Sequence, residues 1–169
     1  MGWVVLTGYM GSGKSTLGPR LAERLGRPFL DSDAEIEAQA ELDIPRIFAT
    51  KGELWFRRTE ERVIREIVGS EPAGVLSIGG GAMERDRTRD LLGRTAHVAW
   101  LKVDPQTLWG RVADSDRPLA TSEGRFIRRY EERIPNYEAG SHVTIDADRP
   151  LDEVLTALVD WATAATAEA

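Results

Sequence analysis

The chain has 169 residues, which is enough for one domain and too few for two sizeable ones. It contains no Cys, which excludes disulfides, thiolate metal sites and a cysteine nucleophile, and its two His leave little room for His-based catalysis. The formal net charge of −6 argues against a general nucleic-acid binder. No apolar stretch is long enough to span a membrane and no signal peptide is visible, so we expect a cytoplasmic protein without a membrane partner.

Most of the basic side chains are arginines, because Lys14, Lys51 and Lys102 are the three lysines among 22 basic residues. Arg is the side chain best suited to gripping carboxylates and phosphates with two parallel hydrogen bonds. Composition bias accounts for most of this excess without any site. The informative question is whether a few arginines gather around Lys14.

The first half of the chain alternates short apolar runs with helical patterns. In chain order it predicts a strand at 3–6, a helix at 17–25, a strand at 28–31, short helices at 34–41 and 45–50, a longer helix at 52–68 and a strand at 75–78. The first helix rests on Leu17, Leu21 and Leu25, which are four residues apart, and on Gly26 as its end. Pro45 suits the first position of a helix.

The second half continues the alternation. It predicts a helix at 85–92, a strand at 97–103, a helix that opens at Pro105, a basic helix at 125–134, a strand at 142–146 and a last helix from 151. Residues 114–124 have no periodicity and many turn formers, which predicts a mobile loop. Pro135 is expected to disturb the helix before it.

This order of elements predicts an α/β protein with a parallel five-stranded sheet and helices on both faces. No internal repeat or long linker interrupts the pattern, so we expect one domain over residues 1–169. Ligands of such sheets bind beyond the carboxyl ends of the strands. Three chemically suggestive segments begin at such ends, at Gly8, Asp31 and Gly79.

The segment from Gly8 to Thr16, GYMGSGKST, fits the phosphate-loop pattern G-x-x-x-x-G-K-[ST] between a predicted strand and a predicted helix. The glycines let backbone N–H groups wrap a phosphate chain at the helix N-terminus. Lys14 then reaches the β- and γ-phosphates, and the Ser15 hydroxyl ligates Mg²⁺. A plain flexible turn is the alternative, which the strand and helix on either side disfavour.

Asp31 and Asp33 close the second predicted strand, and alternate residues of an extended segment point the same way. One carboxylate can hold Mg²⁺ through water, while the other accepts a proton or a hydrogen bond from a substrate hydroxyl. The alternative is that Asp33 merely caps the helix that starts at Ala34.

The third predicted strand runs into Gly79, Gly80 and Gly81. Nucleotide-binding proteins of this kind often end that strand with a carboxylate, but here the place holds Ser77, so Asp31 is the expected acidic partner of Mg²⁺. The three glycines fit either a tight turn or a close approach of the backbone to a ligand, and the local sequence favours neither.

Three arginines are candidates for binding anions. Arg57 is four residues from Glu53, so a surface ion pair is its default interpretation. Arg117 lies in the predicted loop, where an Arg can close over a transferring phosphate. Arg133 lies two residues before Pro135. Position alone favours solvated side chains for all three.

Taken together, GYMGSGKST, LDSD, IFATKGELWFRRTEE, SIGGG, DRPL and ERIPNY occur in the order and approximate spacing of shikimate kinases. The resemblance extends from about Val4 to Ile145. It implies a three-layer P-loop kinase fold like that of nucleoside monophosphate kinases, with sheet order 2-3-1-4-5. It also implies a lid at 114–124, a substrate-binding helical region at 33–62 and a usually monomeric enzyme. Glu41 departs from the family, because many members have Gly there.

The resemblance also implies roles for individual residues. Those matching the ATP phosphate loop are Gly11, Ser12, Gly13, Lys14, Ser15 and Thr16. Ser15 and, through water, Asp31 match the Mg²⁺ ligands, and Asp33 matches the candidate base at the shikimate hydroxyl. Those matching the binding site of the shikimate carboxylate and ring are Arg57, Arg133, Gly79, Gly80 and Gly81. Arg117 matches the lid arginine, a catalytic residue that reaches the phosphates, and Arg111 and Arg149 lie where the family packs the adenine.

The leading hypothesis is therefore an enzyme that transfers a phosphoryl group from ATP to the 3-hydroxyl of shikimate, in the synthesis of aromatic amino acid precursors. Its expected partners are ATP, Mg²⁺ and shikimate. One alternative is a kinase for another small hydroxy acid such as gluconate, which two carboxylate-gripping arginines do not exclude. The other is a non-catalytic ATP-binding module, and an intact Asp33 and Arg117 argue against it.

Overall fold

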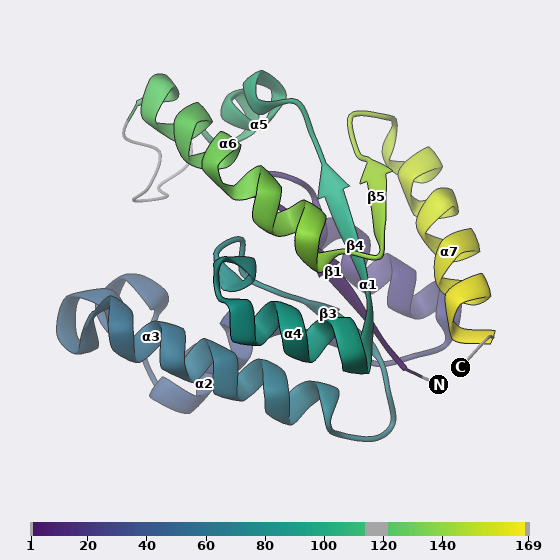
Figure 1. Cartoon of the computed structure of the whole chain (residues 1–169), viewed down its shortest axis with the longest axis horizontal. Helices are drawn as coiled ribbons and strands as arrows, with labels where there is room; N and C mark the ends of the chain where they lie inside the picture. The colour runs from purple at the N-terminus through teal and green to yellow at the C-terminus, as the bar shows by residue number, and fades with distance from the viewer. Residues whose placement is uncertain (1, 114–121, 168–169) are drawn as a thin grey trace.

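The computed structural model describes residues 2–113 and 122–167. Its strands are β1 (Trp3–Thr7), β2 (Phe29–Asp31), β3 (Val75–Ser77), β4 (Ala96–Lys102) and β5 (Val143–Asp146). All pair in parallel in the order β2-β3-β1-β4-β5, which confirms the expected topology (Figure 1). The register places Asp31 opposite Ser77, and Ser77 opposite Leu6, so the polar ends of β2 and β3 lie at the same edge of the sheet as the end of β1.

Helices cover both faces of the sheet and complete three layers (Figure 1). They are α1 (Lys14–Leu25), α2 (Ser32–Ala40), α3 (Ile44–Val68), α4 (Asp86–Thr95), α5 (Pro105–Val112), α6 (Glu123–Gly140) and α7 (Leu151–Ala167), with a 3₁₀ turn at Ala82–Glu84. Helices α1 and α7 pack together on one face, while α4 and α6 pack on the other, with α3 beside α4. None of the helices in the described ranges is both long and apolar enough to cross a bilayer.

The centre of the core is β1, whose five residues are all buried. Val4, Val5 and Leu6 are 0% exposed, as expected for a central parallel strand with helices on both faces. The strand leads directly into the phosphate loop. A fully buried strand thus anchors the loop that the sequence assigns to nucleotide phosphates.

Helices α2 and α3 pack on each other and span the segment 33–62, whose role in substrate binding stays a prediction. Residues 45–50 and 52–68, predicted as two helices, are joined in α3, but the backbone leaves the helical conformation at Gly52 (φ 80°, ψ 166°). Such angles are accessible essentially to Gly alone. The kink turns the second half of α3 so that Phe56 is buried and Arg57 lines the cavity described below.

Glu41 ends α2 in the left-handed conformation, with φ 53°. The resemblance noted from the sequence implies Gly at this position. A residue with a side chain pays about 1 kcal/mol to adopt it. Glu41 therefore carries a conformational cost that Gly would avoid, at an exposed position.

The prediction that Pro135 disturbs its helix was wrong, because α6 continues through Pro135 to Gly140. A proline inside a helix loses one backbone hydrogen bond. That loss is offset by a continuous buried face on both sides of Pro135, formed by Phe126, Tyr130, Arg133, Tyr137 and Gly140. The expected lid at 114–124 lies outside the described residues over 114–121, and Glu123 and Gly124 belong to α6 instead.

Candidate active site

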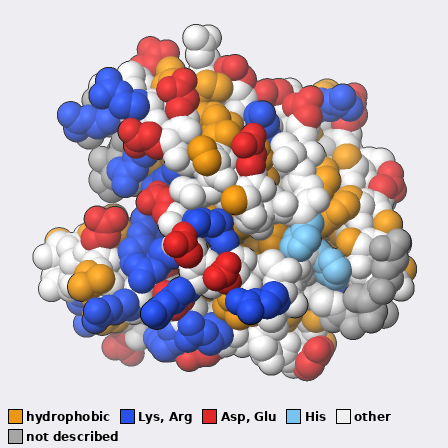
Figure 2. Space-filling view, in the orientation of Figure 1, with side chains coloured by type: hydrophobic (Ala, Val, Ile, Leu, Met, Phe, Trp, Pro, Cys, Tyr) orange, Lys and Arg blue, Asp and Glu red, His pale blue; other side chains and the backbone are white. Residues whose placement is uncertain are grey.

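A cavity of about 1000 Å³, hereafter the main cavity, lies at the carboxyl ends of the strands. Its lining includes the phosphate loop, the start of α2, both halves of α3 and the glycines after β3. Most of the site residues predicted from the sequence line it, although they come from segments far apart in the chain. Arg and Lys side chains gather beside Asp and Glu side chains along α3 and α6 (Figure 2).

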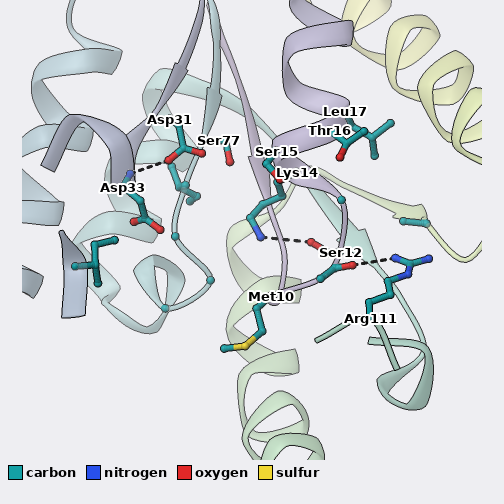
Figure 3. Close-up of a pocket in the computed structure, with 18 of the residues that line it drawn as sticks. Met10, Ser12, Lys14, Ser15, Thr16, Leu17, Asp31, Asp33, Ser77 and Arg111 are labelled. Carbon is teal, nitrogen blue, oxygen red and sulfur yellow. Dashed lines mark hydrogen bonds between the residues drawn. The ribbon is translucent and has the colours of Figure 1, made fainter. Parts of the chain in front are cut away.

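The phosphate loop wraps around the side chain of Lys14 (Figure 3). The Nζ ammonium donates to the carbonyls of Gly8 at 2.6 Å and Tyr9 at 3.2 Å, and to Ser12 Oγ at 3.4 Å. Gly13 precedes α1, so the N-terminus of that helix opens into the main cavity. A helix N-terminus and a lysine ammonium at one place form a site for a polyanion.

The two aspartates after β2 have different structural roles. Asp31, and not Asp33, caps α2: its Oδ1 accepts hydrogen bonds from the N–H groups of Asp33 at 2.9 Å and Ala34 at 3.3 Å. The alternative that Asp33 is the cap is therefore wrong. Because Asp31 takes over this role, the Asp33 carboxylate is left available for chemistry.

Asp31 lies beside Ser77 on the neighbouring strand, and Ser15 lies in the first turn of α1 (Figure 3). All three side chains line the main cavity. No group of three or more acidic or His side chains within the described residues can hold a metal alone. Mg²⁺ commonly binds one or two protein oxygens together with substrate phosphates and water. The Ser15 hydroxyl and the Asp31 carboxylate, which also caps α2, suit that mode.

Asp33 is buried enough to shift its protonation. Burial, together with the nearby charge of Asp31, raises the pKa of its carboxyl to about 6, although Lys14 and Arg57 oppose the shift. Its Oδ1 is buried and makes no hydrogen bond within the described part of the chain. A buried acceptor without a donor is costly, so this oxygen is suited to receive a hydrogen bond from a ligand hydroxyl.

Arg57 is held by Glu60, one helical turn further along α3. Its Nη1 donates to Glu60 Oε2 at 2.8 Å, whereas the expected Glu53 pair is longer, at 3.8 Å. The guanidinium also lies 5.3 Å from the centre of the Phe56 ring. The expected ion pair with Glu53 is present, but the interpretation of Arg57 as a solvated surface side chain is wrong, because the side chain is 15% exposed and lines the main cavity.

Arg133 enters the main cavity from α6 and is 5% exposed. Its Nε forms an ion pair with Glu84 Oε1, and its guanidinium lies 5.2 Å from the centre of the Tyr9 ring. Tyr137, one turn along α6, donates its hydroxyl proton to the Gly80 carbonyl at 2.6 Å. These contacts hold α6 against both the phosphate loop and the glycine turn.

The three glycines after β3 make room for site side chains. A Cβ on Gly79 would lie 2.7 Å from Glu60 Oε1 and 2.9 Å from Asp33 Oδ1, and one on Gly81 would lie 2.5 Å from Arg57 Nη2. The glycines form a turn before the 3₁₀ segment, as one interpretation expects, and they also let charged side chains of the chain approach the backbone. A close approach of this backbone to a ligand stays a prediction.

The residues matched to the adenine site lie along the same cavity. Arg111 donates from Nη1 to the carbonyl of Gly11 at 2.9 Å, and Arg149 donates from Nε to Asp146 Oδ2 at 3.3 Å. Both line the main cavity. Arg117, the predicted lid arginine, lies outside the described residues.

Glu60 is a site residue that the sequence reasoning missed. It is 1% exposed, and burial raises the pKa of its carboxyl to about 7 although Arg57 opposes the shift. Its Oε1 has no hydrogen-bond partner within the described residues. The available signal was its spacing of three residues from Arg57 on a predicted helix, which places both side chains on one face.

Sequence comparison points to a single family. The model for shikimate kinase matches residues 10–163. A shikimate kinase from Ruegeria pomeroyi is 43% identical over 161 residues, which cover 92% of this chain and 82% of that protein. A shikimate kinase from Symbiobacterium thermophilum is 40% identical over 164 residues, covering 93% of this chain and 94% of the relative.

Structural comparison agrees. A shikimate kinase from Acinetobacter baumannii, solved in complex with shikimate, superimposes with a TM-score of 0.89 and 32% identity, covering 97% of this chain and 94% of that one. A gluconokinase from Sinorhizobium meliloti, at a TM-score of 0.63 and 22% identity, shares the fold alone, over 94% of this chain and 90% of its own. The match to the family model over most of the chain, the close relatives and the contents of the main cavity agree, and the chain belongs to the shikimate kinase family.

Proposed function

We propose that this enzyme transfers the γ-phosphoryl group of ATP to the 3-hydroxyl of shikimate in the main cavity. The family assignment makes the chain an ATP-dependent phosphotransferase that acts on shikimate. The observation that carries the assignment of roles is one cavity with the Lys14 loop, the unpartnered Asp33 oxygen, buried Arg133 and largely buried Arg57. A triphosphate, a hydroxyl and a carboxylate each find a matching group there.

The phosphate loop, residues 11–16, binds the phosphates through its backbone N–H groups and Lys14. Phosphoryl transfer depends mostly on positioning and on stabilising the charge that spreads over the γ-phosphoryl oxygens. Lys14 supplies a positive charge there. Arg117 is proposed to add a second one from the lid, and Arg111 and Arg149 to flank the adenine.

Arg57 and Arg133 bind the shikimate carboxylate, and Gly79, Gly80 and Gly81 contact the ring side through their backbone. Two rigid guanidinium groups fix both the position and the orientation of a planar carboxylate. Asp33 accepts the hydrogen bond of the reacting hydroxyl and takes up its proton during transfer. A pKa near 6 keeps this group ionised at neutral pH and only moderately basic.

Ser15 and Asp31 are proposed to hold Mg²⁺, Asp31 through water. When bound with ATP, the ion neutralises phosphate charge. We further propose that the enzyme acts as a cytoplasmic monomer. We also propose that it binds no nucleic acid, which its net charge of −6 supports.

A substrate panel under Mg·ATP tests this function. ADP release is measured with a coupled assay in the presence of shikimate, gluconate and other small hydroxy acids. Shikimate-dependent release is expected, with kcat/KM for shikimate far above that for gluconate. Folded protein that binds ATP but releases no ADP with shikimate would be a non-catalytic nucleotide-binding module.

Replacing Arg57 with alanine is expected to raise the KM for shikimate about tenfold to a hundredfold, the equivalent of roughly 1.5–3 kcal/mol of charged hydrogen bonding. The KM for ATP should change little, because the phosphate loop lies elsewhere in the cavity. Steady-state kinetics with each substrate varied in turn provide the measurement.

Arg58→Ala is the matched control, because Arg58 is the next residue of the same helix and is exposed. It should leave both KM values within about twofold of the parent, as for most surface substitutions. If Arg57→Ala weakened both substrates equally, Arg57 would be a structural residue and the carboxylate assignment would be wrong.

A further inference from the structure

The two arginines of the proposed carboxylate site are held in the same way. Each guanidinium has a close acidic partner and lies near one aromatic ring: Arg57 has Glu60 and Phe56, with Glu53 at a longer distance, and Arg133 has Glu84 and Tyr9. The acidic partners differ in place. Glu60 is buried and lines the main cavity, whereas the Glu84 side chain is 40% exposed and does not line it.

Arg133 separates the main cavity from a second, smaller one. This α6 depression, of about 570 Å³, is lined by Glu84 and by side chains of α6 that include Arg128, Arg129 and Glu132. Arg133 lines both hollows. Its Nη1 faces the glycine turn, because a Cβ on Gly80 would lie 3.7 Å from it, while its Nε pairs with Glu84. Glu84 therefore contacts Arg133 from the side away from the proposed shikimate pocket.

The backbone of Glu84 is fixed by the same turn that lines the main cavity. Its N–H donates to the carbonyl of Gly81 at 3.1 Å. The pair with Arg133, together with the bond from Tyr137 to Gly80, joins α6 to this turn at two neighbouring points. The geometry thus places one anchored carboxylate against one edge of the guanidinium and leaves Nη1 beside Gly80.

We propose that Glu84 is a positioning residue that orients the Arg133 guanidinium for the carboxylate of shikimate. The proposal rests on the proposed role of Arg133. The ion pair at Nε restricts rotation of the planar guanidinium. Arg133 therefore loses less conformational entropy when it binds its ligand. The negative charge of Glu84 acts in the opposite direction, since it repels a second carboxylate. Because Glu84 is 40% exposed, solvent and salt screen that repulsion, and orientation is the larger effect.

The test compares Glu84→Ala and Glu84→Gln by calorimetric titration with shikimate and by steady-state kinetics. Glu84→Ala is expected to weaken shikimate binding about tenfold, because it leaves the buried Arg133 guanidinium without its acidic partner, with kcat and the KM for ATP within about twofold. Glu84→Gln keeps a side-chain oxygen of the same reach beside Nε and should retain most of the affinity, within about threefold. Glu132→Ala is the control, because it removes an exposed carboxylate from the same depression and should change affinity less than about twofold.

A double-mutant cycle separates this role from a general structural one. In an Arg133→Ala background, Glu84→Ala should cause no further loss of shikimate affinity. Tighter shikimate binding by both Glu84 variants would overturn the proposal, as would equal losses for shikimate and ATP or an undiminished effect without Arg133. Calorimetry keeps the two proposals distinct: a parent protein that binds shikimate without turnover contradicts the proposed function, and unchanged binding by Glu84→Ala contradicts the role of Glu84.

Discussion

Replacing Lys14 with alanine is expected to lower kcat about a thousandfold, at the upper end of what one preorganised donor contributes to a transition state. The ammonium is held over the phosphate loop by the carbonyls of Gly8 and Tyr9, so its position is set before any ligand arrives. The charge it stabilises is greatest when the phosphoryl group is in transit. The loss should therefore appear in kcat more than in the KM for shikimate.

The measurement is ADP release at saturating ATP and shikimate, with circular dichroism to confirm folding. Lys51→Ala is the control, because that lysine is exposed, lies against Trp55 and does not line the main cavity. It should turn over at the parental rate. Turnover close to that of the parent in Lys14→Ala would overturn the assignment of the phosphate loop.

The sequence predicted the elements that depend on local patterns. The run at 3–6 and the motif at 8–16 each carry their own signal, since a buried parallel strand and a phosphate loop are recognisable without the rest of the chain. The order of the strands came from the resemblance to a family. With that order, the three segments at strand ends were expected to meet, and they line one cavity.

What the sequence did not predict depends on contacts between distant segments. The sequence presents Glu60 as one more charge on an amphipathic helix. In the folded chain its side chain is buried, with the backbone of Gly79 packed against it. Pro135 reads as the end of a helix, but packing of Tyr137 against the glycine turn carries α6 past it. The pair between Arg133 and Glu84 joins residues 49 positions apart, which no local pattern encodes.

The Asp33 carboxylate is expected to promote turnover and to destabilise the fold, and replacing it with Asn separates these two effects. Asp33→Asn is expected to lower kcat at least about a hundredfold, because the amide cannot take up the proton of the reacting hydroxyl. In the parent, kcat/KM should rise with pH as this carboxyl ionises, around pH 6, and the slope should be weaker in the variant. Glu60, with a pKa of about 7, adds a second ionisation to the same limb, which Glu60→Gln should remove.

The same substitution should stabilise the fold at high pH. The pKa of Asp33 is about 6 in the folded chain, above its ordinary value of 3.8, so the folded state binds more protons than the unfolded state between these values. Stability is therefore lost as pH rises through this window, and above pH 6 the ionised carboxylate carries the full cost of its burial. Asn carries no charge and escapes that cost.

Calorimetric melting at two pH values measures the difference. Asp33→Asn should raise Tm by a few degrees at pH 8. The gain should shrink toward pH 4, where the carboxyl of the folded parent is largely protonated and as uncharged as the amide. Glu35→Gln, on the same helix but outside the main cavity, should show no such gain. A lower Tm for Asp33→Asn at pH 8 would mean that this carboxylate stabilises the fold, and its placement as an ionised group held for the reacting hydroxyl would be wrong. A higher Tm joined to lost turnover is the result expected of a charge that is buried for catalysis at the expense of stability.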